Sequence, residues 1–263
     1  MPITAPAPGA PCWFELSSSA PNVSLAFYCA LFGWQSASQD MGGMGSYTFL
    51  SNASGVVGAL CGLPPGSEGR RSAWGVYFLV ANVDASVAQA RALGGQLLFD
   101  PFDVPGMGRG ACLADPGGAV FSLWQPASAE GGGLALFETC AFGWVELATR
   151  DAEGMRDFYS TLLGWTCTTS PIPVPGAGNY IEYAVAGTRY GGILPMTKEW
   201  GDMPAHWSMY VLVDDVDVCL RRTQELGGSV CVPAFDVPGV GRIARIDDPT
   251  GAGLYVIRMA AGA

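Results

Sequence analysis

Short apolar runs and helical stripes alternate along the first third of the chain. The run Trp13–Leu16 is typical of a strand, and the apolar positions within Val23–Phe32 are spaced as one face of a helix that Gly33 ends. The same order returns with the strand-like run Val76–Val80 and a helical stripe over Val83–Leu93 that a Gly-Gly pair ends. Several short strand candidates follow each helix. The pattern predicts βαβββ units, and the chain has room for four.

One octamer occurs twice, as FDVPGMGR at Phe102–Arg109 and as FDVPGVGR at Phe235–Arg242. Its Pro-Gly pair predicts a turn, and its second glycine admits backbone angles that a β-carbon would forbid. The octamer is therefore expected to be a shaped loop. The ion pairs expected across the two loops are Asp103 with Arg109 and Asp236 with Arg242.

Three further pairs of segments repeat in the same order, with an offset that grows from 131 to 133 residues. The growth places a two-residue insertion in the second copy, near Pro171–Pro175. The chain is therefore interpreted as two homologous domains, 1–128 and 129–263. The pairs are FYCALFGW (27–34) with FYSTLLGW (158–165), NVDASVAQARALGG (82–95) with DVDVCLRRTQELGG (215–228), and DPGGAVFSLW (115–124) with DPTGAGLYVI (248–257).

Composition narrows the class of protein. Of 263 residues, 49% are hydrophobic and 14% are charged, which suits two ordinary cores. The net charge of −10 with scattered basic residues disfavours nucleic acid as a partner. No apolar run reaches the roughly 20 residues of a membrane helix and no signal sequence is evident, so a cytoplasmic protein is expected. The eight cysteines show no CxxC spacing and are expected to be buried free thiols rather than disulfides.

The motifs FYxxLxGW, DVDxxxxxxxxLGG and DPxGxxF, together with the four units, resemble the vicinal oxygen chelate superfamily. It includes glyoxalase I, the bleomycin-resistance proteins, methylmalonyl-CoA epimerase and the extradiol dioxygenases. The octamer is similar to one in a two-domain actinobacterial branch labelled glyoxalase-like or hydroxylase. The resemblance implies an α+β fold of two tandem domains. Each domain would pair two βαβββ units into a cup-shaped mixed sheet with helices outside.

The resemblance also implies a divalent metal held by the first, fourth, fifth and eighth strands of each cup. The fourth-strand windows, 56–63 and 189–195, contain no carboxylate or histidine. Glu15, Glu146 and His206 lie two residues from ligand positions and could share their faces, but a glutamate with one histidine is short of the usual three protein ligands. We therefore expect no cofactor, and a bound metal stays an alternative. The remaining ligand positions hold Trp13 and Trp144, Gly75 and Ser208, and Ser122 and Tyr255.

A cup without a metal could still bind a small molecule. Aromatic walls with a few polar groups are typical of such sites, and indoles suit a planar aromatic or polyketide-like ligand. The alternative is that these aromatic residues fill the cups as core and that the two glutamates cap a loop or pair with an arginine. The expected ligand-binding residues are Trp13, Glu15, Ser122, Trp124, Trp144, Glu146, Ser208 and Tyr255.

Two other functions stay open from the sequence. The chain could be a lyase, isomerase or oxygenase, with Glu146 as general base and His206 or Tyr255 as acid. It could also be a protein-interaction module with degenerate cups. If one cup is active, the second is favoured, because it alone has His206 and Tyr255. No membrane partner is expected, and the chain is expected to be a monomer or a weak homodimer. His206 could equally be a half-exposed residue at a strand entrance.

Overall fold

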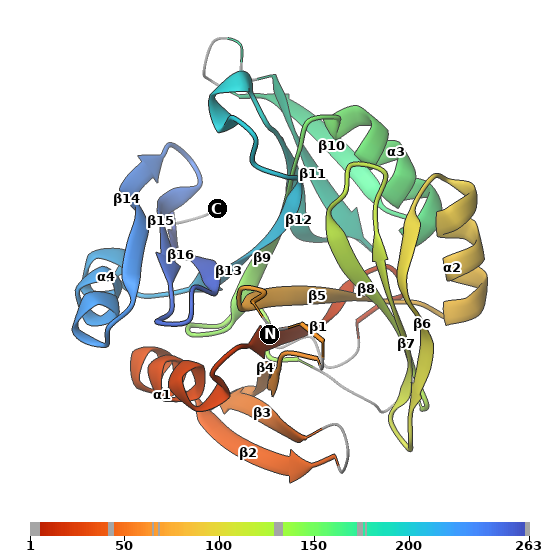
Figure 1. The fold of residues 1–263 in the computed structure, drawn as a ribbon. Coiled ribbons are helices and arrows are strands. Elements are labelled where there is room, and N and C mark those ends of the chain that lie inside the picture. The colour runs from red at the N-terminus through yellow and green to blue at the C-terminus, as the bar shows by residue number, and fades with distance from the viewer. Residues whose placement is uncertain are drawn as a thin grey trace.

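The computed structural model describes residues 6–41, 45–64, 66–67, 69–128, 134–172, 176 and 178–260. Two eight-stranded mixed sheets follow one another along the chain, and each carries two helices (Figure 1). The predicted α+β fold of two tandem domains is confirmed. The predicted domain boundary follows residue 128, and residues 129–133 lie outside the described residues. Most of the predicted insertion around Pro171–Pro175 lies outside them too.

The first sheet has the strand order β2-β3-β4-β1-β5-β8-β7-β6. Strand β1 pairs in parallel with β4 and antiparallel with β5, and β5 pairs in parallel with β8. Two βαβββ units therefore meet at β1 and β5. The elements are β1 (Pro11–Ser18), α1 (Pro21–Phe32), β2 (Gln35–Asp40), β3 (Ser46–Asn52), β4 (Gly55–Gly62), β5 (Ala73–Leu79), α2 (Val83–Ala92), β6 (Gln96–Val104), β7 (Gly108–Ala114) and β8 (Val120–Pro126).

The second sheet repeats this topology as β10-β11-β12-β9-β13-β16-β15-β14. Its two units meet at β9 and β13, so the prediction of four βαβββ units is confirmed. The elements are β9 (Phe142–Thr149), α3 (Ala152–Leu163), β10 (Thr166–Pro171), β11 (Asn179–Val185), β12 (Thr188–Pro195), the 3-10 helix η2 (Lys198–Trp200), β13 (His206–Leu212), α4 (Val216–Glu225), β14 (Ser229–Val237), β15 (Gly241–Asp247) and β16 (Gly253–Met259).

Local signals set the helix boundaries. Gly33 and Gly164 adopt left-handed angles, with φ of 70° and 71°, and end α1 and α3. Asn82 and Asp215 begin α2 and α4 by accepting a hydrogen bond from the backbone NH three residues later. The sequence pattern predicted the helix end at Gly33 and the end of α2 just before the Gly94-Gly95 pair.

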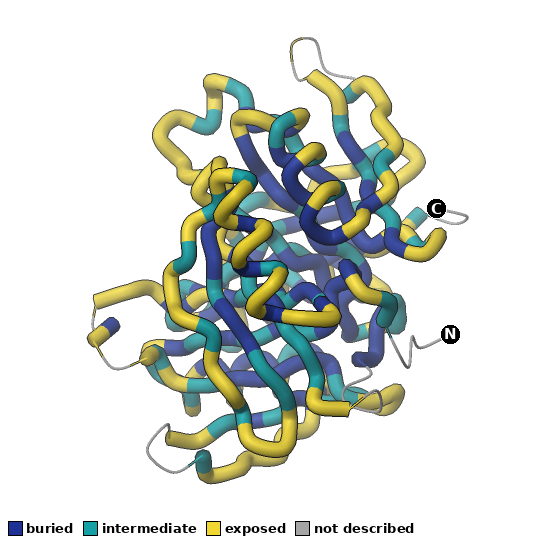
Figure 2. Tube along the Cα trace, turned by 90° about the vertical axis from the view of Figure 1, so that its right-hand side faces the viewer, coloured by how far each residue is buried: buried dark blue, intermediate teal, exposed yellow. Residues whose placement is uncertain are grey.

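Each sheet has a buried face and a half-buried face. Along β1, Phe14, Leu16 and Ser18 are buried, whereas Trp13, Glu15 and Ser17 alternate with them and keep partial exposure. We call the half-buried face of the first sheet cup A and the half-buried face of the second sheet cup B. Figure 2 shows buried residues along the middle of the strands and exposed residues at the hairpin tips.

The buried faces of the two sheets turn toward each other and form one continuous core. The Phe14 and Phe142 rings lie 4.2 Å apart, and those of Phe78 and Trp207 lie 5.3 Å apart. Helix α1 lies beside α4, and α2 beside α3, so each helix pair joins the two domains (Figure 1). The cups consequently open on opposite sides of a shared core.

The repeated Gly-Trp pair at the end of each FYxxLxGW motif serves this junction. Trp34 Nε1 donates to the Cys140 carbonyl at 2.7 Å, and Trp165 Nε1 donates to the Gly9 carbonyl at 2.8 Å. All eight cysteines are unpaired in the structure, as predicted, but the predicted burial holds only for Cys12 and Cys219, and Cys231 is exposed. None of the helices in the described part of the chain is long and apolar enough to cross a membrane.

Candidate functional site

Glu15 is the carboxylate at the floor of cup A. It lies on β1, beside Gly75 of β5, and both of its oxygens accept hydrogen bonds from tyrosines. The Tyr47 hydroxyl donates to Oε2 at 2.7 Å, and the Tyr77 hydroxyl donates to Oε1 at 3.0 Å. Trp13 extends the chain, because its Nε1 donates to the Tyr47 hydroxyl at 2.8 Å. Three strands therefore hold one carboxylate through neutral donors.

Cup B contains the same network. The Tyr180 hydroxyl donates to Glu146 Oε2 at 2.8 Å, and the Tyr210 hydroxyl donates to Oε1 at 2.7 Å. Trp144 Nε1 donates to the Tyr180 hydroxyl at 2.9 Å. The two domains have thus kept one arrangement, Trp–Tyr–Glu–Tyr, at the same strand positions.

Burial governs the electrostatics of both carboxylates. It raises the pKa of Glu15 and of Glu146 above the ordinary glutamate value, and the tyrosine hydrogen bonds oppose this rise only in part. Among the described residues, no arginine forms an ion pair with either glutamate. The expectation that these glutamates cap a loop or pair with an arginine is therefore corrected, because tyrosines satisfy both carboxylates.

The structure separates His206 from Glu146. His206 begins β13 opposite Ala148, while Ser208 lies opposite Glu146. His206 Nδ1 instead lies 2.9 Å from the Pro204 carbonyl, within its own loop. The half-exposed strand-entrance alternative describes its position, and His206 would need to move to act on the same atoms as Glu146.

The remaining predicted residues share the cup faces. Ser122 lies on β8 beside Tyr77, and Trp124 lies two residues further along the same face. Tyr255 of β16 lies beside Tyr210, and their rings stack with centroids 4.6 Å apart at 14°. Tyr255 is therefore an aromatic wall of cup B and makes no hydrogen bond with Glu146.

Sequence reasoning missed the four tyrosines that bind the carboxylates. Tyr47 and Tyr180 are 133 residues apart, as are Tyr77 and Tyr210, which is the octamer offset. A search for polar residues kept at that offset would have found them. The metal positions that the resemblance implies lie on the first, fourth, fifth and eighth strands, whereas Tyr47 and Tyr180 lie on the third strand of each domain, β3 and β11.

The cups do not fit the divalent metal that the resemblance implies. Within the described part of the chain, no group of three histidine, cysteine, aspartate or glutamate side chains converges as a metal site. The Glu15 and Glu146 carboxylates each have both oxygens bonded to phenols, and the first-strand ligand position is an indole, which cannot be a ligand, in both cups. The donor set is instead suited to hydrogen bonding.

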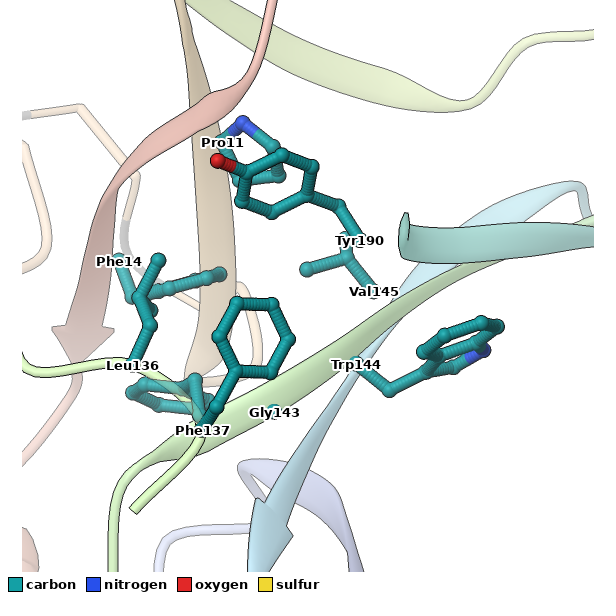
Figure 3. A pocket seen from close by; sticks show the side chains of 9 residues that line it. Pro11, Phe14, Leu136, Phe137, Gly143, Trp144, Val145 and Tyr190 are labelled. Carbon is teal, nitrogen blue, oxygen red and sulfur yellow. The ribbon is translucent and has the colours of Figure 1, made fainter. Parts of the chain in front are cut away.

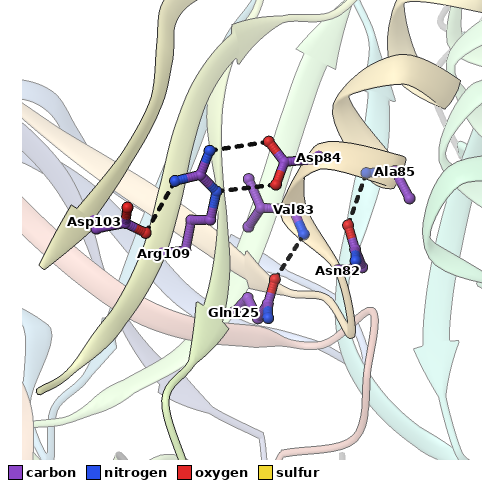
Figure 4. Close-up of polar contacts among 7 residues, drawn as sticks. All are labelled: Asn82, Val83, Asp84, Ala85, Asp103, Arg109 and Gln125. Carbon is purple, nitrogen blue, oxygen red and sulfur yellow. Dashed lines mark hydrogen bonds and ion pairs between the residues drawn. The ribbon is translucent and has the colours of Figure 1, made fainter.

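The repeated octamer ties a hairpin to a helix. Arg109 of β7 makes bidentate contacts of 3.0 Å with Asp84 of α2 and a contact of 2.9 Å with Asp103 (Figure 4). The same pattern holds for Arg242 with Asp217 and Asp236. The predicted ion pairs are confirmed. The partners Asp84 and Asp217 were missed, because only the packing of the helix against the hairpin brings them close.

Two cavities lie outside the cups. One of about 10 Å³ lies between the domains, where Phe14 and Phe137 converge and the Trp144 ring points away (Figure 3). It is apolar and at the lower limit for one water molecule, so it is a packing gap. The other is an open groove of about 360 Å³ between Asn52–Ser54 and Glu138–Cys140, and it contains no carboxylate pair or histidine.

A family model now explains the doubled geometry. The model described as the Glyoxalase/Bleomycin resistance protein/Dioxygenase superfamily matches residues 13–123 and again residues 141–255. The chain belongs to this superfamily. The resemblance read from the sequence motifs is confirmed, and each matched segment spans one cup.

Relatives within the superfamily cover nearly the whole chain. The anthracycline biosynthesis protein DnrV of Streptomyces peucetius is 35% identical over 99% of this chain and 97% of its own length. Two superfamily structures share the fold at low identity. A Mn(II)-bound glyoxalase from Novosphingobium aromaticivorans has a TM-score of 0.66 at 15% identity, covering 98% of this chain and 82% of its own. A homoprotocatechuate 2,3-dioxygenase from B. fuscum has a TM-score of 0.64 at 17% identity, covering 99% and 74%.

Proposed function

We propose that this superfamily member binds a planar aromatic small molecule with hydroxyl substituents in a cup, without a catalytic metal. The observation that carries the proposal is the duplicated Trp–Tyr–Glu–Tyr network on the cup faces. A carboxylate oxygen can accept more than one hydrogen bond, so each glutamate has acceptor capacity left after binding its tyrosines. A ligand hydroxyl would use that capacity.

The surrounding side chains suit an aromatic ring. Trp13, Tyr77 and Trp124 line cup A from β1, β5 and β8, and each is only half-buried. Sites for small molecules combine such apolar walls with a few polar groups that fix orientation. The name of DnrV links that relative to anthracycline biosynthesis. We carry this over as the ligand class, a polycyclic aromatic compound with phenolic hydroxyls.

Titration with alizarin, a planar dihydroxyanthraquinone, tests the proposal. Saturable quenching of tryptophan fluorescence and a shift of the alizarin absorption band are expected in the wild type. The Glu15→Gln/Glu146→Gln double variant loses an anionic acceptor in each cup, and alizarin affinity is expected to fall about tenfold or more. Unsubstituted anthraquinone is the matched probe, because its affinity should not respond to these substitutions. Absence of saturable alizarin binding contradicts the proposal.

A second candidate function rests on the raised pKa of the two glutamates. A buried carboxylate beside phenols can take a proton from a bound ligand and return it, as an isomerase requires. Incubation of the protein with a bound phenolic ketone in D2O, followed by mass spectrometry, tests this. Deuterium uptake at a carbon atom of the ligand would support the isomerase function if the Glu15→Gln/Glu146→Gln double variant abolishes that uptake. Uptake that is equal in the variant contradicts it.

A further inference from the structure

The two cups differ in whether a tyrosine covers the floor. In cup B the Tyr255 ring stacks on the Tyr210 ring, with a centroid distance of 4.6 Å and an interplanar angle of 14°. Tyr210 is the tyrosine that donates to Glu146 Oε1. One aromatic ring of the protein therefore already lies flat against the carboxylate network of this cup.

In cup A the covering ring is missing. Tyr77 occupies the place of Tyr210, because it donates to Oε1 of Glu15 and pairs with the same position of the last strand. That position is Ser122 in cup A and Tyr255 in cup B. Among the described residues, no aromatic ring stacks on Tyr77. Ser122 therefore supplies no ring beside Tyr77 of the kind that Tyr255 supplies beside Tyr210.

The far wall of cup A is aromatic and exposed as well. Phe102 lies opposite Gly110, and Gly110 lies opposite Trp124, so all three share the cup face. A β-carbon on Gly110 would lie 2.9 Å from the Phe102 ring and 3.3 Å from the Trp124 ring. Phe102 nevertheless keeps 42% of its surface exposed, and Phe99, also on β6, keeps 51%.

Cup B differs at two of these positions, whereas Phe235 takes the place of Phe102 and keeps 43% of its surface exposed. Ile243 and Ile257 take the places of Gly110 and Trp124 in the sheet register. Both isoleucines are buried in one cluster with Tyr210, against which Trp144 and Tyr255 pack. Cup B therefore packs its own side chains against Tyr210, whereas cup A has a serine and a glycine at the positions of Tyr255 and Ile243.

We infer that cup A is the ligand site, and that an aromatic ring of the ligand occupies there the place that the Tyr255 ring occupies in cup B. The ring stacks on Tyr77, its edge faces Trp124 and Phe102, and a ring hydroxyl donates to Glu15. Offset stacking at this spacing is a favoured geometry for aromatic pairs. The inference rests on the proposed function and reverses the sequence-based preference for the second cup.

Exchange of the two residues tests the inference. Ser122→Tyr gives cup A the cover that cup B has, and alizarin affinity is expected to fall at least about tenfold. Tyr255→Ser uncovers Tyr210, and the number of alizarin sites is expected to rise from one to two. The double exchange is expected to leave one site, now in cup B. Far-ultraviolet circular dichroism and thermal unfolding establish that each variant is folded.

The outcomes separate this inference from the proposed function. If the wild type binds no alizarin, both fall. If the wild type binds and Ser122→Tyr binds equally well, or if Tyr255→Ser abolishes binding, the assignment to cup A is wrong while the proposed function stands. Should Ser122→Tyr fail to fold, Tyr77→Leu and Tyr210→Leu replace it. Tyr77→Leu should weaken alizarin binding and Tyr210→Leu should not. Loss of alizarin binding in Tyr210→Leu alone overturns the inference.

Discussion

The Tyr47 hydroxyl lies 2.7 Å from Glu15 Oε2. Tyr47 is on β3, which is not adjacent to β5, the strand of Tyr77, the other tyrosine bound to this carboxylate. Strands β3 and β5 flank the pair β4 and β1, so the two phenols reach Glu15 from opposite sides of the floor. The carboxylate therefore links the two βαβββ units of its domain through neutral donors. The hydrogen bonding and the protonation of this carboxylate should therefore affect the stability of the fold.

Removal of one phenol hydroxyl should destabilise the protein. Tyr47→Phe leaves Glu15 with one donor and Trp13 Nε1 without its acceptor. Loss of a hydrogen bond to a partly buried carboxylate costs about 1.5 to 3 kcal/mol, to be measured as the free energy of unfolding in urea. Tyr255→Phe is the matched control, because its hydroxyl has no hydrogen bond with the described residues, and its effect should be smaller. Equal losses in the two variants contradict this account.

The two glutamates should make stability depend on pH. Burial raises the folded-state pKa of Glu15 and Glu146. The folded protein then keeps protons that the unfolded chain has released, so their stabilising contribution is complete below the ordinary glutamate pKa and is lost as pH rises through the raised pKa. The free energy of unfolding of the wild type, minus that of Glu15→Gln/Glu146→Gln, should fall by at most about 1.4 kcal/mol per pH unit per glutamate.

Chemical denaturation of both proteins at a series of pH values measures this difference. Subtraction of the double variant removes other titrating groups, including Asp115, whose pKa burial also raises. A wild type that gains stability relative to the variant as pH rises would show that the glutamates are ionised and favourably held in the folded state.

Metal binding should not depend on the cup carboxylates. Protein purified without an affinity tag and incubated with Fe(II), Zn, Ni or Mn is expected to retain no near-stoichiometric metal after dialysis, by elemental mass spectrometry. Glu146→Ala should give the same content as the wild type, because Glu146 belongs to no group of three potential ligands in the described part of the chain. Stoichiometric metal in the wild type that Glu146→Ala loses would overturn the proposed function and direct effort to glyoxalase and dioxygenase chemistry.

The octamer arginines should stabilise the protein in a salt-sensitive manner. Arg109→Gln removes the bidentate contact between β7 and α2. The melting temperature should fall at low ionic strength, and the fall should shrink near 1 M salt, because salt screens exposed charges. Arg222→Gln is the control, since the one ion pair of Arg222 with a described residue is with Glu225 on its own helix. A larger fall in melting temperature for Arg222→Gln than for Arg109→Gln would show that the octamer arginine does not stabilise the contact between the hairpin and α2.

Several residues were readable from sequence because their signals are local. Gly33 marked a helix end through backbone angles that glycine adopts without strain, and the repeated motifs marked two domains. The Asp103–Arg109 pair was predictable because both residues belong to one hairpin. In each case the interacting groups lie within a few residues of one another, so spacing alone fixes their geometry.

The site depended on contacts that spacing does not fix. Glu15 could be placed on a cup face by alternation, but its partner Tyr47 lies 32 residues away on a strand that reaches it only when the sheet curls. The same alternation put His206 on the face of Glu146 without giving the distance between them. Strand register and curvature set these contacts, and both depend on long-range pairing.

The sequence by itself determined the doubled α+β fold and the residue types at the expected ligand positions, because motif order and residue chemistry do not depend on distance. Only the tertiary structure decided which hydroxyls hold Glu15 and Glu146, and that Tyr255 covers Tyr210 while Ser122 leaves Tyr77 bare. Sequence supplies the side chains on a face. Packing decides which of them touch, because stacking and hydrogen bonding act over a few ångströms between strands far apart in the chain.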